Sequence, residues 1–540
     1  MKRKKIIIFT LSILFTLFFD IGTSFIIYEN LSLFKKGYNI VFFLILFLII
    51  YKLILFVFHL LEGYHSEDKV PSKLNSLYFF FEKNTFWVSF ASLIGCFLIY
   101  MVAFYPAILS PDPSFQILQY FGIDNKYSYY STLIDSNVIM TNHHPIFHTL
   151  LLGTCVKIGE FFRNTNLGLF IYSIFQTTIL ASTLSYTLCF MKKMNVNKNY
   201  ILICLMIYAL TPVFPFYAMS PVKDVIFSCL IIHYIIILWN YIKTNEISLL
   251  KTIPLLLLIM LFRNNGFHIL ILSLPFLFFT KKKMIKIGSL CIITLTFYFT
   301  YNSVILPFFH ITPGSIREVL SIPFQQTARY VTYYDVTKKE KKAIDKILEY
   351  KTIKKRYLPE KADPVKNKYN PYATKRDLKN YFDVWFEMLK KHPDIYLEAT
   401  LHNTYGYFYP LKTNWYIYTN EYKEVLNNNG FDYHFNHLST LRIILIIYGV
   451  IFPYIPGLGL IVNIGFSTWL LLFMISYLIY KKKYKEIIPY TPMIIVFLVC
   501  LASPVNTYFR YAMPNIFVMP MMIGIFLRII NPNIKTKNNS

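Results

Sequence analysis

The side chains of this sequence that could move protons or bind phosphate occur in five short segments beside long apolar runs. An ionisable group at membrane depth is costly unless it is paired, so each segment raises a functional question. The segments contain Asp112, His143-His144, Lys223-Asp224, Arg263-Asn264 and Arg510-Tyr511. Carboxylates and imidazoles can accept protons, and the planar guanidinium fork of arginine fits phosphate oxygens. These residue types suit a reaction that needs a base and a bound phosphate.

Asp112 stands in Ser-Pro-Asp-Pro, at the predicted start of a short helix that ends near Gly122. One interpretation is a helix cap, because aspartate followed by proline is typical of helix starts. The other is a general base, or a ligand of a metal ion bound to a pyrophosphate. The two roles are compatible, since a helix start fixes the side chain. Gln116 lies in the same stretch, and we include it among the candidate substrate contacts.

The two pairs of neighbouring polar residues each allow a structural and a functional interpretation. His143 and His144 precede Pro145, which favours an extended backbone. They could make ordinary interfacial hydrogen bonds, contact a phosphate or sugar hydroxyl, or transfer protons. Lys223 and Asp224 begin a predicted span. They could form an ion pair that caps this helix, or bind substrate, and the positive helix end stabilises the aspartate as an anion.

The two arginines lie at the edges of apolar runs. Their sequences are Phe-Arg-Asn-Asn-Gly at Arg263 and Phe-Arg-Tyr at Arg510. They could anchor the chain to lipid headgroups, or bind the phosphate of a lipid-linked donor. Asn264 and Tyr511, the next residues in the chain, are counted as candidate contacts with them. In the following polar region, Gln325, Gln326 and Arg329 form a further cluster. Its glutamines could bind sugar hydroxyls, or could simply be solvated at a helix start.

The elements that carry these residues are predicted to be membrane helices. The 540 residues are 55% hydrophobic and only 15% charged, and the apolar residues gather in runs of about 18–25, the length of a membrane span. The runs lack the alternation of barrel strands, so the chain is expected to be an all-α polytopic membrane protein with about twelve spans. The expected spans are 6–28, 39–61, 85–105, 166–191, 200–217, 222–242, a pair within 252–280, 287–308, 463–480, 486–503 and 514–530.

Lysine-rich turns predict which side of the membrane each segment faces. The net charge is +26, and much of it lies in short connections beside apolar runs, where it marks the cytoplasmic side. Both termini are therefore expected in the cytoplasm. The same rule makes 145–162 an interfacial segment and 439–461 an interfacial or re-entrant one, rather than spans. No basic stripe is interleaved with stacking aromatics, so nucleic acid is not an expected partner.

This orientation divides the chain into four parts. It also places the five segments that contain the candidate functional residues at the outer face. The long polar region is large enough for a small, mainly helical domain, with helices expected near 336–350 and 375–391. The predicted parts are 1–84 (two spans and a cytoplasmic loop), 85–308 (a membrane core with outer loop 106–165), 309–437 (an extracytoplasmic domain) and 438–540 (spans and a cytoplasmic tail). None of the seven cysteines has zinc-site spacing.

Several motifs, in their order, resemble the GT-C superfamily of membrane glycosyltransferases. They are Ser-Pro-Asp, Asn-His-His-Pro, Pro-Val-Lys-Asp, Arg-Asn-Asn-Gly, Ile-Pro-Phe-Gln-Gln-Thr-Ala-Arg and Phe-Arg-Tyr-Ala-Met-Pro. More closely, they look like an uncharacterised bacterial multispan family assigned to that group, and the likeness runs from about residue 85 to 530. The resemblance implies a GT-C-like fold in the bacterial cell membrane. It also implies transfer of a sugar from a polyprenyl-phosphate carrier, with Asp112 as base and Arg510 and Arg263 as phosphate contacts.

The sequence departs from that superfamily in two ways and leaves other functions open. Two extra spans precede the expected first one, and Asp112 is followed by Pro113 instead of a second acid. The use of a divalent metal is therefore open. An anionic envelope polymer would suit the basic outer region as acceptor. A transporter or flippase of a lipid-linked glycan, and a non-catalytic scaffold of envelope assembly, are the competing hypotheses.

Overall fold

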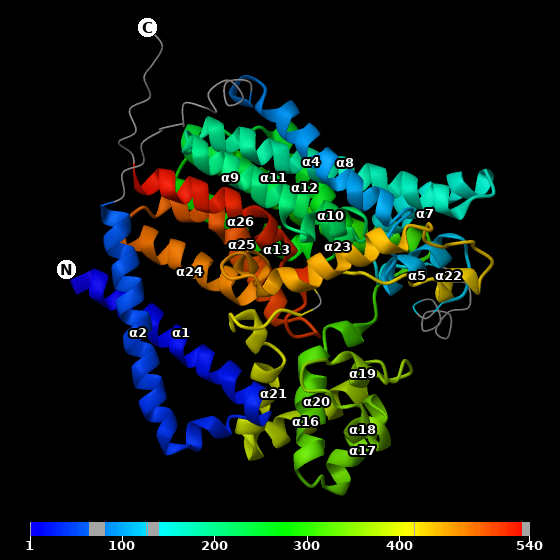
Figure 1. Cartoon of the computed structure of the whole chain (residues 1–540). Coiled ribbons are helices and arrows are strands. Elements are labelled where there is room, and N and C mark those ends of the chain that lie inside the picture. Colours follow the sequence, from blue (N-terminus) through cyan, green and yellow to red (C-terminus); the bar gives the residue numbers. More distant parts are fainter. Residues whose placement is uncertain (1, 64–80, 126, 128–139, 415, 532–540) are drawn as a thin grey trace.

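The computed structural model of the chain describes residues 2–63, 81–125, 127, 140–414 and 416–531. These residues are mainly helical (Figure 1). Their one sheet is a parallel pair of two-residue strands, β1 (Met140–Thr141) and β2 (Ile311–Thr312).

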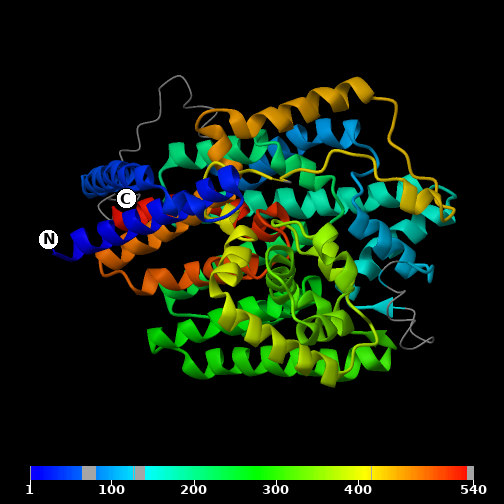
Figure 2. The same cartoon turned by 90° about the horizontal axis from the view of Figure 1, so that it is seen from below.

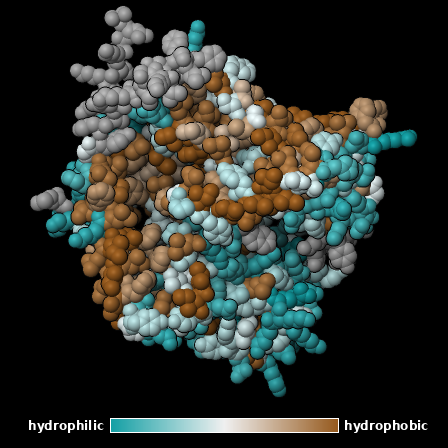
Figure 3. Space-filling view, in the orientation of Figure 1, coloured by the Kyte–Doolittle hydropathy of each residue, from teal (hydrophilic) through white to brown (hydrophobic). Residues whose placement is uncertain are grey.

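Seven helices in the described residues are long and apolar enough to cross a bilayer. They are α1 (Lys2–Tyr28), α2 (Gly37–Glu62), α4 (Thr85–Ala103), α8 (Thr165–Lys193), α11 (Lys223–Thr244), α14 with its continuation (Met284–Phe308) and α26 (Phe509–Ile530). None of the residues in the most apolar stretch of α2 is buried inside the protein. Figure 3 shows such uncovered apolar residues over the helical body. The chain is therefore a multi-pass, all-α membrane protein.

Shorter apolar helices fill the spaces between the long ones. They are α9 (Lys198–Leu210), α12 (Leu249–Phe262), α13 with a following 3₁₀ segment (Gly266–Thr280), α23 with its 3₁₀ end (Ser439–Tyr454) and α24 (Ile464–Tyr480). Two other elements, α10 (Val213–Ala218) and α25 (Thr491–Leu501), are shorter still. The helices α12 and α13 form the hairpin predicted from the sequence, with Arg263 in the turn.

The lysine-bearing turns gather at one end of the helical body, which we call the basic end. Contacts between turns join them there: Lys4 with Glu62 at 2.7 Å, Lys198 with Glu82 at 3.0 Å, Lys193 with Asn240 at 3.1 Å, Lys283 with Glu246 at 2.8 Å, and Lys483 with the Ile529 carbonyl at 2.6 Å. The start of α1 and the end of α26 also lie on this side in both views (Figures 1 and 2).

A small helical domain lies at the opposite end, which we call the domain end. Its helices are α16 (Ser321–Tyr333), α17 (Lys338–Ile347), α18 (Ile353–Arg356), α19 (Asp363–Lys366), α20 (Lys375–Lys391) and α21 (Pro393–His402). Capping boxes at Thr337 and Thr374 begin α17 and α20, the two helices predicted here. The domain has its own core, made by buried residues between Leu320 and Tyr396. Later residues such as Tyr407 and Tyr433 belong to the core of the membrane helices instead.

The two segments expected to be interfacial stay near the domain end. Helix α7 (Ile146–Phe161) is only 16 residues long. It packs closely on α8, since a Cβ on Gly159 would collide with the backbone of Gly168. Helix α23 (Ser439–Ile451) begins near the end of α4, where Arg442 donates to the Ala103 carbonyl at 3.1 Å. Tyr448 then reaches the Leu210 carbonyl at the end of α9 at 2.7 Å. This segment therefore does not pass to the basic end.

Candidate functional site

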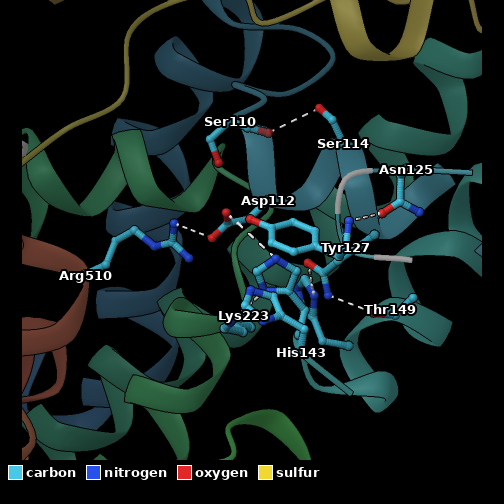
Figure 4. Close-up of polar contacts among 12 residues, drawn as sticks. Ser110, Asp112, Ser114, Asn125, Tyr127, His143, Thr149, Lys223 and Arg510 are labelled. Carbon is cyan, nitrogen blue, oxygen red and sulfur yellow. Dashed lines mark hydrogen bonds and ion pairs between the residues drawn. The ribbon is translucent and has the colours of Figure 1, made fainter. Parts of the chain in front are cut away.

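Five helices begin around one cluster of charged residues at the domain end. They are α5 (Pro111–Tyr120), α7, α11, α13 and α26. Asp112, Lys223 and Arg510 stand in the first turns of α5, α11 and α26, while His144 and Arg263 lie just before α7 and α13. Because helix N-termini carry partial positive charge, this convergence favours anions there. Ion pairs and hydrogen bonds join the five segments that the sequence singled out. Figure 4 shows Asp112, His143, Lys223 and Arg510 close together.

Asp112 does not cap its helix. Ser110 occupies the N-cap position with extended backbone angles, and Pro111 is the first helical residue. Proline suits that place because its missing N–H would be unpaired there anyway. The Asp112 carboxylate instead makes an ion pair with Arg510, with 2.9 Å between Oδ2 and Nη1. The capping interpretation was thus wrong, and the helix start serves to present the carboxylate to the cluster.

Arg510 bridges two aspartates. Its Nε and Nη2 donate to Oδ2 of Asp224 at 2.8 and 2.7 Å, while Nη1 faces Asp112. Nη1 also donates to the hydroxyls of Tyr418 at 3.1 Å and Tyr508 at 3.3 Å. Asp224 is fully buried. A buried carboxylate requires such pairing, because removing a charge from water costs several kcal/mol.

Arg263 makes the second ion pair of Asp224, with 3.2 Å between its Nη1 and Oδ1. Its guanidinium lies 5.0 Å from the ring centroid of Tyr511 and 5.3 Å from that of Phe227. Both arginines are buried, so anchoring to lipid headgroups was the wrong interpretation for them. The expected Lys223–Asp224 cap was wrong too, because among the described residues the ion-pair partners of Asp224 are the two arginines.

Lys223 contacts His144 instead. Its ammonium donates to the imidazole Nδ1 at 2.8 Å, which leaves the proton of the neutral ring on Nε2. Burial, reinforced by the charge of Lys223, holds the pKa of His144 well below its usual value, so the ring is neutral. The buried Nε2 makes no hydrogen bond and faces Oδ1 of Asp112 at 3.9 Å. A small movement of either side chain would close this gap.

The cluster keeps Asp112 ionised. Burial alone would raise the pKa of Asp112, but the charges of Arg510 and Lys223 outweigh it and hold this pKa well below its ordinary value. Three cations, Lys223, Arg263 and Arg510, face two carboxylates, Asp112 and Asp224. With His144 neutral, the cluster carries one positive charge in excess. It can therefore accept an anion.

Asn142 and Asn264 fix the histidine segment. The Asn142 N–H donates to the Thr312 carbonyl at 2.7 Å, next to the β1–β2 pair, and its side-chain oxygen accepts from the Ile146 N–H at 3.1 Å. Asn264 donates from Nδ2 to the Asn142 carbonyl at 2.9 Å. Asn264, predicted as a substrate contact, thus ties the α12–α13 turn to the histidines.

Four predicted substrate contacts lie elsewhere. Gln116 is buried between α5 and α7, where it donates to Thr149 at 2.9 Å. Gln325 donates to the Pro359 carbonyl at 3.0 Å, and Gln326 donates to Thr400 at 2.9 Å. Arg329 is buried, and its Nη2 pairs with Glu398 at 2.6 Å. The last three therefore hold the small domain together, and neither glutamine is solvated at a helix start.

Tyr127, Glu318 and Lys366, which the sequence did not single out, lie around His143. His143 lies 3.9 Å from Glu318, which also pairs with Lys366 at 2.6 Å. Tyr127 stacks on His143 with 4.2 Å between ring centroids. Burial lowers the pKa of His143 to about 4, against the opposing charge of Glu318. Glu318 and Lys366 had no distinguishing signal in a polar region rich in lysine, tyrosine and asparagine.

Carboxylates, histidines and cysteines do not gather into a metal-binding set in the described residues. No three of them come together as potential ligands there. In the cluster it is arginine and lysine that neutralise the carboxylates.

Comparison with known proteins gives a family and no function. The matched family model extends over residues 133–540, which includes the histidines, Lys223, Asp224 and both arginines but not Asp112. No curated protein and no solved structure matches the chain. Because the match covers well over half of the sequence, the protein belongs to the family of unknown function DUF6020.

Proposed function

We propose that this protein is a GT-C-type membrane glycosyltransferase, which moves a sugar from a polyprenyl-phosphate carrier to a hydroxyl of a cell-envelope acceptor. The observation that carries the proposal is the pairing of a partly exposed carboxylate, Asp112, with a buried, net positive cluster at the domain end. A sugar transfer needs a base near the acceptor oxygen and positive charge near the departing phosphate. Both stand within one ion-paired cluster.

In the proposed reaction, the acceptor hydroxyl attacks the anomeric carbon of the donor sugar. Asp112 takes the hydroxyl proton while the bond between that carbon and the phosphate oxygen breaks. The electron pair leaves with the phosphate, whose added negative charge is stabilised by Arg510, Arg263 and Lys223 and by the converging helix N-termini. The acceptor is one of the envelope polymers, and an anionic one suits the basic outer region.

The proposal includes a membrane arrangement. The basic end lies in the cytoplasm with both termini, and the domain end faces outward from a bacterial plasma membrane. About twelve helices span the bilayer, if α9, α12, α13, α24, and α25 with its preceding 3₁₀ turn are counted with the seven long ones. A lipid phosphate at the outer surface would then reach the cluster without leaving the membrane.

Burial of the charged residues favours an enzyme over the two competing functions. A transporter places its functional charges along a path through the membrane, whereas this cluster lies at one end. A scaffold has no need for buried arginines at a partly exposed carboxylate. The cost of burying such charges is better explained by a site that uses them.

The decisive experiment compares envelope glycans in cells that lack the protein and in cells that regain it. We expect one sugar modification to disappear on deletion and to return with the wild type and with Asp124→Asn, a change at an exposed aspartate. Asp112→Asn should reach the membrane in equal amount and restore nothing. Full restoration by Asp112→Asn would refute the proposed chemistry. Accumulation of a complete, already glycosylated lipid-linked precursor on deletion would indicate a transporter instead.

A further inference from the structure

Arg510 holds its two aspartates by different parts of its guanidinium group. Nε and Nη2 both donate to one oxygen of Asp224, at 2.8 and 2.7 Å. Only Nη1 reaches Asp112, at 2.9 Å. Losing the contact with Asp112 would therefore leave the arginine anchored, with its planar fork in the same place.

The two aspartates also differ in their access to solvent. The side chain of Asp224 has no exposed surface, whereas that of Asp112 is 26% exposed. An entering ligand can reach the Asp112 side of the guanidinium but not the Asp224 side. Asp112 is thus the exchangeable partner of Arg510, and Asp224 is the permanent one.

We propose that a phosphate group entering the site competes with Asp112 for Nη1 of Arg510, and that this exchange releases the Asp112 carboxylate to act as a base. The inference rests on the proposed function and adds to it an order of events, in which the donor phosphate must bind before the base becomes available. A phosphate oxygen is a suitable competitor because guanidinium groups bind phosphate and carboxylate with the same geometry.

The exchange changes the basicity of Asp112 in a definite direction. The groups that face Asp112 are Arg510 from α26, Lys223 from α11, His143 and His144 before α7, His148 from α7, and the phenols of Tyr127, Tyr418, Tyr508 and Tyr511. Arg510 lowers the pKa of Asp112 more than any other of these groups. When phosphate takes over Nη1 and adds its own negative charge, the pKa of Asp112 must rise. A carboxylate with a higher pKa and no ion-pair partner is a better proton acceptor.

His144 can then complete the arrangement. The Nε2–H of its neutral ring faces the released carboxylate from 3.9 Å and makes no hydrogen bond before the exchange. Lys223 keeps the ring in this tautomer through Nδ1. The freed Asp112 therefore has a neutral donor available in place of a charged one, so it stays oriented without being neutralised.

The test measures the protonation of Asp112 directly in the full-length protein. A hydrophobic carbodiimide reacts with protonated carboxyl groups, and mass spectrometry of the Asp112 peptide gives the modified fraction at each pH. The protein is labelled in vesicles of phosphatidylcholine alone, with inorganic phosphate, or with polyprenyl phosphate in the bilayer. Potassium chloride at matched ionic strength controls for screening.

We expect the labelling midpoint of Asp112 to rise by about 1–3 pH units when a phosphate ligand is present, the usual effect of losing a close cationic partner. A shift with inorganic phosphate would mean that the phosphate group alone causes the exchange. A shift only with polyprenyl phosphate would mean that the lipid must deliver it. An unchanged midpoint with both ligands would overturn the inference.

Variants of Arg510 give a second test, in which the labelling midpoint is measured both without and with phosphate. Arg510→Gln should raise the labelling midpoint without phosphate and make it insensitive to phosphate. Arg510→Lys retains the charge beside Asp224 and is the alternative if the glutamine variant does not fold. A midpoint that stays low and still responds to phosphate in a folded variant would also overturn the inference.

The two proposals can fail separately. If Asp112→Asn abolishes sugar transfer but phosphate does not change the labelling of the wild-type protein, the inference fails and the proposed function stands. If phosphate changes the labelling but deletion of the protein leaves the envelope glycans unchanged, the proposed function fails.

Discussion

Lys223 and His144 are hydrogen-bonded partners although 79 residues separate them in the chain. The bond joins the first residue of α11 to the segment before α7 and fixes which imidazole nitrogen carries the proton. A histidine in this setting acts as an oriented N–H donor toward Asp112 instead of a free proton carrier.

Removing the His144 donor should therefore impair transfer without removing the base. We expect His144→Leu to lower the rate of sugar transfer about 10²-fold, the usual effect of a misplaced reacting group. His144→Gln retains an N–H donor and should recover part of the rate. Transfer rates in membranes, normalised to the amount of protein, measure the effect. Equal rates for both variants and the wild type would exclude an orienting role.

Asp224 should matter for folding as much as for function. Asp224→Asn leaves Arg263 and Arg510 without their shared buried counter-charge, and breaking a buried pair costs about 3–5 kcal/mol. We expect little folded protein in the membrane and a lower thermal unfolding temperature in detergent. The matched control is Asp124→Asn at an exposed site, which should stay within about 0.5 kcal/mol of the wild type. Normal folding of Asp224→Asn would contradict the ion-paired arrangement.

Gly406 should be required for the loop that carries Arg510. A Cβ at this position would collide with the side chain of Thr507, three residues before the arginine. We expect Gly406→Ala to destabilise the protein by about 1–3 kcal/mol, as overpacking does, and to weaken transfer by moving Arg510. Gly95→Ala, where a Cβ meets nothing within 4 Å, provides the comparison. Thermal unfolding and transfer assays on both variants decide whether the close contact exists.

The protein should lose stability in acid because His143 resists protonation. Burial lowers its pKa to about 4, whereas an unfolded histidine titrates near 6.5. Above pH 6.5 neither form is charged, so stability does not change. As the pH falls from about 6.5 to 4, only the unfolded chain gains the proton, which costs about 3 kcal/mol of stability.

Two substitutions separate this effect from general acid denaturation. His143→Gln should make the unfolding temperature fall less steeply between pH 6.5 and 4. His437→Gln, at an exposed histidine, should keep the slope of the wild type. Thermal scans in detergent at several pH values measure both. Identical slopes for His143→Gln and the wild type would mean that His143 is solvated.

The spacing of apolar residues and the positions of the lysines predicted the helices well. They did not predict which side chains form ion pairs and hydrogen bonds with one another. The α12–α13 hairpin at Arg263 and the domain helices α17 and α20 follow from local sequence, because a Gly-containing polar turn and capping residues act over a few positions. The sequence also predicted that Asp112, Lys223 and Arg510 lie together at one face, because the lysine-rich turns put all three segments at the same side of the membrane.

What the sequence could not predict depends on contacts between distant segments. Lys223 stands beside Asp224 in the chain, yet successive positions of a helix point in different directions, so one reaches His144 and the other the arginines. Gln325 and Gln326 looked exposed because their partners lie 33 or more positions further along the chain. The contribution of Glu318 required knowing how the small domain docks.

The order of the bridged residues along the chain has a consequence for biosynthesis. Asp112 and Asp224 are made early, and the helix that brings Arg510 is the last one described. Until the ribosome has delivered that helix, Asp224 lacks one of the two arginines that pair with it among the described residues, and Asp112 lacks its arginine. A nascent chain at this stage should be a substrate for membrane quality control, so that a premature stop before α26 would cause degradation instead of a partly active protein.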